Sequence, residues 1–152
     1  MKQSPGDQKI IERMAPGILC REGFLGRDSR SLAEILDTDR STLEGLGLTH
    51  AQVAARLREA LGRAMASLGA PVSVDVQWTA IFRESMGRIP CPWGTCGVFP
   101  KGEVELVNKE SGEVVRFTPL STHLIAEHGF YQGRGARYRL DPKNVSRIFS
   151  LT

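Results

Sequence analysis

The sequence predicts an α+β fold in which an N-terminal helical lobe is followed by a small antiparallel sheet with a hairpin and C-terminal helices. Three observations lead to this prediction. Before Gly69, apolar residues recur every three or four positions, which is the period of an amphipathic helix. After Pro71, apolar and polar residues alternate, which is the period of a half-buried strand. A turn sequence at residues 108–112 then separates two short segments of strand character, as in a β-hairpin.

Size and composition fit one compact domain or two small lobes. The chain has 152 residues, of which 41% are hydrophobic and 24% are charged, so it can bury a core. We expect residues 1–8 to be disordered, residues 9–70 to form the helical lobe and residues 71–152 to form the lobe with the sheet. No apolar run is long enough to span a membrane and the N-terminus has no apolar signal segment, so we expect a cytoplasmic location.

Three helix-start signals define the helical lobe. They follow residues 9–26, which we expect to form a short helix or turns. Each signal is a hydroxyl residue followed three positions later by a carboxylate or an amide, which is the spacing of a capping box. The signals begin at Ser31, Ser41 and Thr49, and residues 37–40 are expected to separate the first two helices.

The third helix of this lobe is the longest. Its apolar residues recur at helical spacing and are Val53, Leu57, Leu61, Met65 and Leu68. Helices of this kind occur both in small bundles and in helix-turn-helix proteins that read DNA. Because the third helix has no basic face, a small bundle is the preferred interpretation.

The strand signals lie after the helical lobe. Residues 72–82 alternate along most of their length and are predicted to form one strand with one face on the core. Residues 103–106 and residues 114–117 are predicted to pair as an antiparallel hairpin.

Two helices are predicted at the C-terminus. Thr118 and Pro119 read as an N-cap followed by proline at the first helical position, and the helix should run to about His128 before a left-handed Gly129. A last short helix is predicted to start near residues 141–142.

The chemistry of the sequence is concentrated in two cysteines and two histidines. Cys91 and Cys96 lie across a turn shaped by proline and glycine, and His123 and His128 lie in the helix after the predicted hairpin. Two thiolates and two imidazoles form a tetrahedral donor set that suits zinc, and the hairpin would bring the two pairs together. Histidines five residues apart differ by about 140° around an ideal helix, so we expect the last turn to tighten or unwind. The alternative is that the cysteines are buried thiols and the histidines only line or cap the helix.

This region resembles known zinc sites. Cys91-Pro92 followed by Cys96-Gly97 resembles a zinc knuckle with two extra residues, and the order of knuckle, hairpin and helix resembles the treble-clef arrangement. The pair His123 and His128 is similar to the histidine pair of bacterial two-Cys, two-His zinc-finger regulators. The resemblance implies a zinc site built around these four ligands. It implies no particular function, because treble clefs serve many functions.

The net positive charge lies at the C-terminus. Residues 119–152 contain five basic and two acidic residues and so carry the whole net charge of +3. Arg134, Arg137, Arg139 and Lys143 lie close to two tyrosines in a glycine-rich stretch. Arginines can contact phosphates and aromatic rings can stack on bases, so nucleic acid or another polyanion is a candidate partner. The alternative is that the aromatic residues anchor a loop on the core and the arginines are solvated.

These features leave three functional interpretations. Four protein ligands would close the zinc coordination shell, which favours a small zinc-binding protein with a structural site, associated with nucleic acid or with regulation. A zinc-dependent hydrolase would need one open position for water, with Glu127 or another carboxylate as the base. A protein-interaction adaptor would bind a protein partner through an apolar groove of the helical lobe. No Gly-rich phosphate loop, paired-carboxylate site or Ser–His–Asp signature stands out, and the four candidate ligands favour a binding protein over an enzyme.

Overall fold

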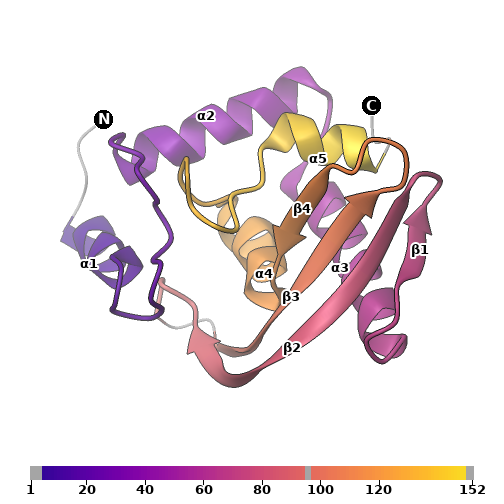
Figure 1. Cartoon of the computed structure of the whole chain (residues 1–152). Coiled ribbons are helices and arrows are strands. Elements are labelled where there is room, and N and C mark those ends of the chain that lie inside the picture. The colour runs from indigo at the N-terminus through magenta and orange to yellow at the C-terminus, as the bar shows by residue number, and fades with distance from the viewer. Residues whose placement is uncertain (1–4, 95–96, 150–152) are drawn as a thin grey trace.

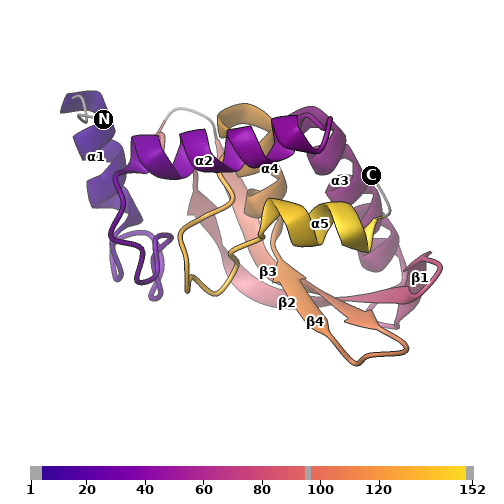
Figure 2. The same ribbon diagram turned by 90° about the horizontal axis from the view of Figure 1, so that it is seen from above.

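The computed structural model describes residues 5–94 and 97–149 and confirms the α+β class. Helices lie on one side of a four-stranded antiparallel sheet (Figure 1, Figure 2). The helices are α1 (Pro5–Met14), α2 (Leu32–Gly45), α3 (His50–Ala66), α4 (Pro119–His128) and α5 (Pro142–Ile148). The strands are β1 (Val72–Asp75), β2 (Trp78–Pro90), β3 (Val98–Asn108) and β4 (Val114–Phe117). Among the described residues, no helix combines the length and the apolar character needed to cross a membrane.

The sheet is a meander in which each strand pairs with the next one along the chain. β2 and β3 are much longer than the outer strands, and their pairing runs from Trp78 opposite Asn108 to Pro90 opposite Val98. Their register shifts between Glu84 and Arg88. Beyond this shift β2 and β3 continue as a two-stranded arm, which reaches toward α1 (Figure 1). The long hairpin therefore carries the turn that follows β2 far from the short strands.

The prediction of a single strand over residues 72–82 is wrong. The chain turns at Val76 and Gln77, and β1 and β2 pair as a hairpin. Asp75 stabilises the turn, because its side chain accepts a hydrogen bond of 2.6 Å from the backbone N–H of Val76. Val76 is 87% exposed although it belongs to the alternating apolar series. A short turn can preserve the two-residue period on both sides, so alternation alone did not reveal the break.

The helix boundaries in the C-terminal half are confirmed. Thr118 caps α4 in a capping box with Ser121, and Gly129 ends the helix in the left-handed conformation with φ +61°. Asp141 caps α5 by accepting a hydrogen bond from the backbone of Lys143. The hairpin of β3 and β4 also forms as expected.

The N-terminal half differs from the prediction in two places. The two helices expected after Ser31 and Ser41 are one helix, α2. Arg40 pairs with Asp37 and Glu44 at the (i, i+3) and (i, i+4) spacings, so the polar stretch that was expected to interrupt the helix is accommodated within it. α1 begins at Pro5, so residues 5–8 are helical rather than disordered, while residues 1–4 lie outside the described residues.

The main core lies between the sheet and the helices that cover it (Figure 2). It draws buried side chains from both ranges that the sequence assigns to separate lobes, so residues 9–70 and 71–152 share one core. Representative members from the helices and the sheet are Leu57, Ala60, Trp78, Leu106, Phe117 and Ile125.

A second core lies where α1, α2, α4 and the turn after β2 meet. Its members include Met14 of α1, Ile35 of α2, Leu124 of α4 and Cys91 of the turn. Each of these four side chains is almost completely buried. The second core therefore surrounds one of the predicted metal ligands.

Two distant segments of backbone cross closely beside this core. The N–H of Gly133 donates to the carbonyl of Phe24, and the N–H of Arg27 donates to the carbonyl of Arg134. A Cβ atom on Gly133 would lie 2.2 Å from the carbonyl oxygen of Leu25. Only glycine fits this crossing without a shift of the backbone.

We expect Gly133→Ala to lower the free energy of unfolding by roughly 1–3 kcal/mol, because the added methyl group overlaps backbone that cannot move independently. Gly62→Ala is the matched control, since Gly62 lies in α3 with open space around its Cα, and it should be neutral or stabilising by up to about 1 kcal/mol. Urea denaturation of both variants measures the difference. An unchanged midpoint for Gly133→Ala would show that the crossing is not close-packed.

Candidate metal centre

Three of the four predicted metal ligands converge in the structure. Cys91 follows β2 directly, and His123 and His128 lie on α4. The ligand atoms of these three side chains all lie within 4.8 Å of one another. The Sγ atom of Cys91 is 3.5 Å from Nε2 of His128. This group could hold a metal ion with one sulfur and two nitrogen donors.

Cys96, the fourth predicted ligand, lies outside the described residues. The described residues nearby are held by backbone hydrogen bonds to Cys91. The N–H of Cys91 donates to the carbonyl of Gly97 at 3.2 Å, and the N–H of Gly94 donates to the carbonyl of Cys91 at 2.9 Å. The chain therefore returns to Cys91 immediately after residue 96.

The His123 imidazole is buried without a hydrogen-bond partner at one ring nitrogen. His123 is 8% exposed, and no described residue forms a hydrogen bond with its buried Nε2 atom. Leaving a buried polar atom unpaired costs about 1–3 kcal/mol. A metal ion bound to Nε2 would remove this cost. The orphaned atom therefore fits the donor set that the sequence predicts.

Burial also sets the charge of both imidazoles. Desolvation lowers the pKa of His123 and the pKa of His128 below the usual value for histidine. The proximity of His123 lowers the pKa of His128 further. Both rings are therefore held in the neutral form, which is the form that binds metals.

Aromatic side chains hold the two imidazoles in place. The indole of Trp93 stacks on the ring of His128 with centroids 4.0 Å apart and planes 4° apart. Phe99 packs against His123 with centroids 4.5 Å apart. Trp93 lies in the cysteine-containing turn and Phe99 lies at the start of β3, so both the turn and β3 pack against α4 at the site. The sequence contained both rings, but their register against the histidines depends on the tertiary fold.

The expected distortion of the last helical turn is absent from the described part of α4. The helix continues through His128, and the left-handed residue is Gly129. The centroids of the two imidazole rings are nevertheless only 5.5 Å apart. The two rings therefore meet while the helix remains regular through His128.

The first helix is fastened to the same turn. Nε of Arg13 donates a hydrogen bond to the carbonyl oxygen of Pro92. Its guanidinium also lies beside Gly94, where a Cβ atom would come within 3.1 Å of it. Met14 of the same helix is fully buried in the second core with Cys91. The sequence offered no signal for this contact, because residues 13 and 92 are far apart along the chain.

The four basic residues predicted to bind nucleic acid have different environments. Arg139 donates to both carboxylate oxygens of Asp39 and to the carbonyl of Gln132. The Asp39 side chain is only 4% exposed, so this ion pair belongs to the interior. Arg137 pairs with Glu103 at 2.9 Å. Arg134 and Lys143 are exposed.

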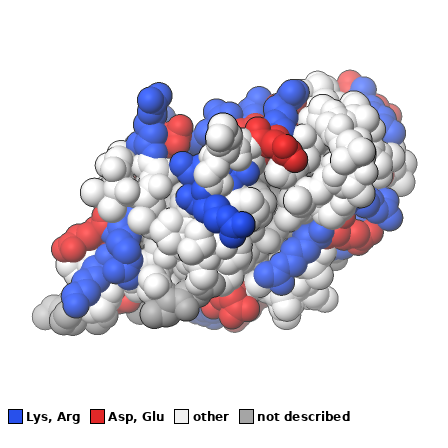
Figure 3. Space-filling view, turned by 90° about the horizontal axis from the view of Figure 1, so that it is seen from below, with Lys and Arg blue, Asp and Glu red and all other residues white. Residues whose placement is uncertain are grey.

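Three of these residues border a common hollow, which we call the α2–α5 hollow. It has a volume of about 480 Å³ and is bordered by Arg134, Arg139, Lys143 and Arg30. Figure 3 shows another aspect of the charge distribution: on the face seen from below, Lys and Arg side chains are scattered, with uncharged surface between many of them. The basic side chains on this face therefore do not form one continuous patch.

We expect Arg139→Glu to lower the free energy of unfolding by about 3–5 kcal/mol, because it places a second carboxylate beside the buried Asp39. Arg134→Glu, on the exposed part of the same loop, should change stability by about 0.5 kcal/mol or less. Chemical denaturation of the two variants in parallel provides the comparison. Equal unfolding midpoints would mean that the Arg139 pair contributes no more than a surface charge.

The comparisons with known proteins add no assignment. No family model, no curated protein and no solved structure matches the chain. The chemistry of the site itself is therefore the basis for a functional interpretation.

Proposed function

We propose that the protein is a small zinc-binding protein with a structural metal centre, in which Cys91, His123 and His128 are three ligands and Cys96 is the fourth. The observation that carries the proposal is the convergence of one thiol and two imidazoles within 4.8 Å, together with the unpartnered, buried Nε2 atom of His123. The choice of Cys96 rests on the spacing of the two cysteines and on the turn that closes at Gly97.

The donor set favours zinc over the other common metal ions. Zinc accepts mixed sulfur and nitrogen ligands in a tetrahedral arrangement. Calcium and magnesium prefer oxygen ligands, and the converging group contains no carboxylate. Both imidazoles are held neutral by burial, which suits metal binding.

The surroundings favour a structural centre over a catalytic one. Cys91 is 1% exposed and His123 is 8% exposed, and Trp93 and Phe99 cover the two imidazoles. A catalytic zinc needs an open position that water and substrate can reach. Glu127, the base in the hydrolase alternative, is exposed on α4 and does not belong to the converging group. Burial of Cys91 and His123, with His128 only partly exposed, therefore supports a closed site.

Zinc in this position would fasten three parts of the fold. It would join the turn at the end of the β2–β3 arm to α4, since one cysteine and both histidines come from these elements. It would also secure α1, which bonds to the same turn through Arg13 and Pro92. The second core has only a small set of apolar residues, so a metal ion at its edge would add stability where burial is limited.

We expect about one zinc ion per chain in purified protein, and removal of the zinc with a chelator should lower the melting temperature. Cys91→Ser and His123→Ala should each lose most of the bound zinc, because each removes a ligand. Cys96→Ser distinguishes the alternatives: a closed four-ligand site loses zinc, whereas a hydrolase with three protein ligands and water retains it.

Cys20→Ser is the matched control for these zinc measurements. Cys20 lies in the segment after α1, outside the converging group, and its variant should keep about one zinc per chain. Native mass spectrometry reports metal content and folded state together. A wild-type protein that is fully folded without metal would rule out the structural centre.

We also propose contact with nucleic acid as a second candidate function. The observation in its favour is the α2–α5 hollow, where the exposed Arg134 and Lys143 meet. Arg30 also borders the hollow, but it pairs with Asp28. Exposed basic side chains around a hollow can neutralise phosphates, and backbone glycines nearby allow close approach. Arg139 borders the hollow but is held by Asp39, so its charge is largely compensated. A protein-interaction adaptor is the alternative to this second function.

If nucleic acid binds at this hollow, the affinity should fall with salt with a slope of about 0.7–0.9 per phosphate neutralised. Arg134→Gln combined with Lys143→Gln should weaken binding at least several-fold. Arg40→Gln, an exposed arginine elsewhere on α2, serves as the control and should bind like wild type. A wild-type protein that retards neither DNA nor RNA at low salt would favour the adaptor instead.

A further inference from the structure

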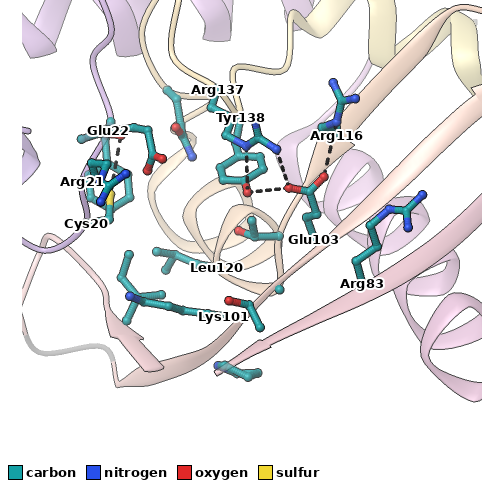
Figure 4. Close-up of a pocket in the computed structure, with 18 of the residues that line it drawn as sticks. Cys20, Arg21, Glu22, Arg83, Lys101, Glu103, Arg116, Leu120, Arg137 and Tyr138 are labelled. Atoms are coloured by element: carbon teal, nitrogen blue, oxygen red, sulfur yellow. Dashed lines mark hydrogen bonds and ion pairs between the residues drawn. The ribbon is translucent and has the colours of Figure 1, made fainter. Parts of the chain in front are cut away.

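We propose that a second hollow, between the β2–β3 hairpin and the loop that follows α4, binds a small organic anion bearing a carboxylate or a phosphate. This β2–β3 hollow has a volume of about 630 Å³. Its border includes Arg83, Glu103, Arg116, Gln132 and Tyr138 (Figure 4). It is separate from the metal ligands, so the inference does not depend on the proposed zinc site.

A network of alternating charges lines one side of the hollow. Glu103 and Glu105 alternate along β3 with the buried Val104 and Leu106, so the side chains of the two glutamates face away from the main core. Three arginines surround these two carboxylates. They form ion pairs between Arg83 and Glu105, between Arg116 and both glutamates, and between Arg137 and Glu103.

The carboxylate at the centre of this network is ionised. Partial burial acts to raise the pKa of Glu103, but hydrogen bonds from Arg137 and Tyr138 outweigh it and lower the pKa below its usual value. Figure 4 shows Glu103 between Tyr138 and Arg116. Three guanidinium groups therefore face two negative charges, and one positive charge is left over in the network.

The remaining charges around the hollow balance. Arg21 and Lys101 are matched in number by Glu22 and Glu84 on the same border. The border therefore has a net positive charge, which would attract an anionic ligand head. Arginine suits such a head, because its planar fork of N–H donors matches a carboxylate or a phosphate.

Gln132 provides an independent sign of a missing partner. It is only 4% exposed, it borders the hollow, and no hydrogen bond joins its side-chain amide to another described residue. Its φ angle is +69°, which is uncommon for a residue other than glycine. Its carbonyl accepts a hydrogen bond from Arg139, which anchors the strained backbone to the interior.

The strained backbone of Gln132 is costly unless the residue has a use, and its side-chain amide, which has no partner among the described residues, borders the hollow. Left-handed backbone at a residue other than glycine costs about 1–3 kcal/mol and is often retained at ligand sites. The amide of Gln132 offers both a donor and an acceptor to a polar group of the ligand. We therefore infer that the ligand carries such a group in addition to its anionic head.

The hollow also has an apolar part that suits the body of a small molecule. Phe24, Ile89 and Leu120 contribute to its border. Pockets for small ligands are typically about 300–1,000 Å³ and combine apolar walls with a few placed polar groups. The β2–β3 hollow lies within this range of volume and adds an apolar part to a mainly charged border, which favours a metabolite-sized ligand over an isolated inorganic ion.

The test is isothermal titration of the full-length protein, as purified, with a defined set of probes. AMP and glucose 6-phosphate represent organic phosphates, and 2-oxoglutarate and benzoate represent organic carboxylates. Adenosine and glucose are the uncharged counterparts of the phosphates. We expect at least one anion to bind, with an affinity at least ten times that of its uncharged counterpart or, for a carboxylate, of its methyl ester.

Gln132→Gly and Arg116→Gln test the location of the site. Each should weaken binding of the active probe at least tenfold. Gln132→Gly should also leave the melting temperature unchanged or raise it, because glycine adopts the left-handed conformation without strain and removes the unpaired amide. Arg134 does not border this hollow, so the Arg134→Gln variant should bind the probe like wild type.

Two results would overturn the proposal. One is the absence of binding for every probe at millimolar concentration. The other is a probe that binds Gln132→Gly and Arg116→Gln as tightly as it binds wild type. Binding of only the phosphate probes, or of only the carboxylate probes, identifies the anionic group of the ligand. The zinc content of the protein has no bearing on either of the two results.

Discussion

The unpaired ring nitrogen of His123 is the constraint on which the organisation of the second core depends. Nε2 is buried at the meeting point of α4 and the turn after β2, and no described residue satisfies it. An apolar core alone would leave this atom at a cost, and a metal ion held by the converging group, as we propose, would remove that cost. The same ion would explain why Cys91 and His128 approach each other and why aromatic rings enclose the site. The long β2–β3 arm brings the turn with Cys91 to α4, and the bond from Arg13 to Pro92 joins α1 to the same turn.

Local signals in the sequence were sufficient for most of the fold. Capping residues such as Thr49, Thr118 and Asp141 determine where helices start, because their side chains bond to backbone a few residues away. The strand break at Val76 was missed, since a two-residue turn leaves the apolar alternation intact on both sides. The continuity of α2 was missed because charged residues interrupt a pattern of hydrophobicity without interrupting the helix, where Arg40 pairs with its neighbours.

The candidate site, like the fold, was predictable from the sequence only in part. The type and spacing of donors predicted the converging group of Cys91, His123 and His128, since these properties are written in the sequence. The environment of each arginine was not predictable, because the tertiary fold determines which acidic residue lies beside it. Arg139 meets Asp39 in the interior and Arg137 meets Glu103 on the sheet, each across a large separation in sequence. The strained Gln132 also becomes recognisable only once its backbone angle and its burial are known.

The coordination shell of the bound metal is the most direct test of the proposed centre. X-ray absorption at the zinc edge, on the protein as purified, reports the identity and distance of the donor atoms. We expect a mixed shell with sulfur at about 2.3 Å and nitrogen at about 2.0–2.1 Å, together with the outer-shell scattering of imidazole. A shell with two sulfur donors would indicate that both Cys91 and Cys96 are ligands. A shell of oxygen and nitrogen alone, without sulfur, would contradict a centre built on the cysteine turn and α4.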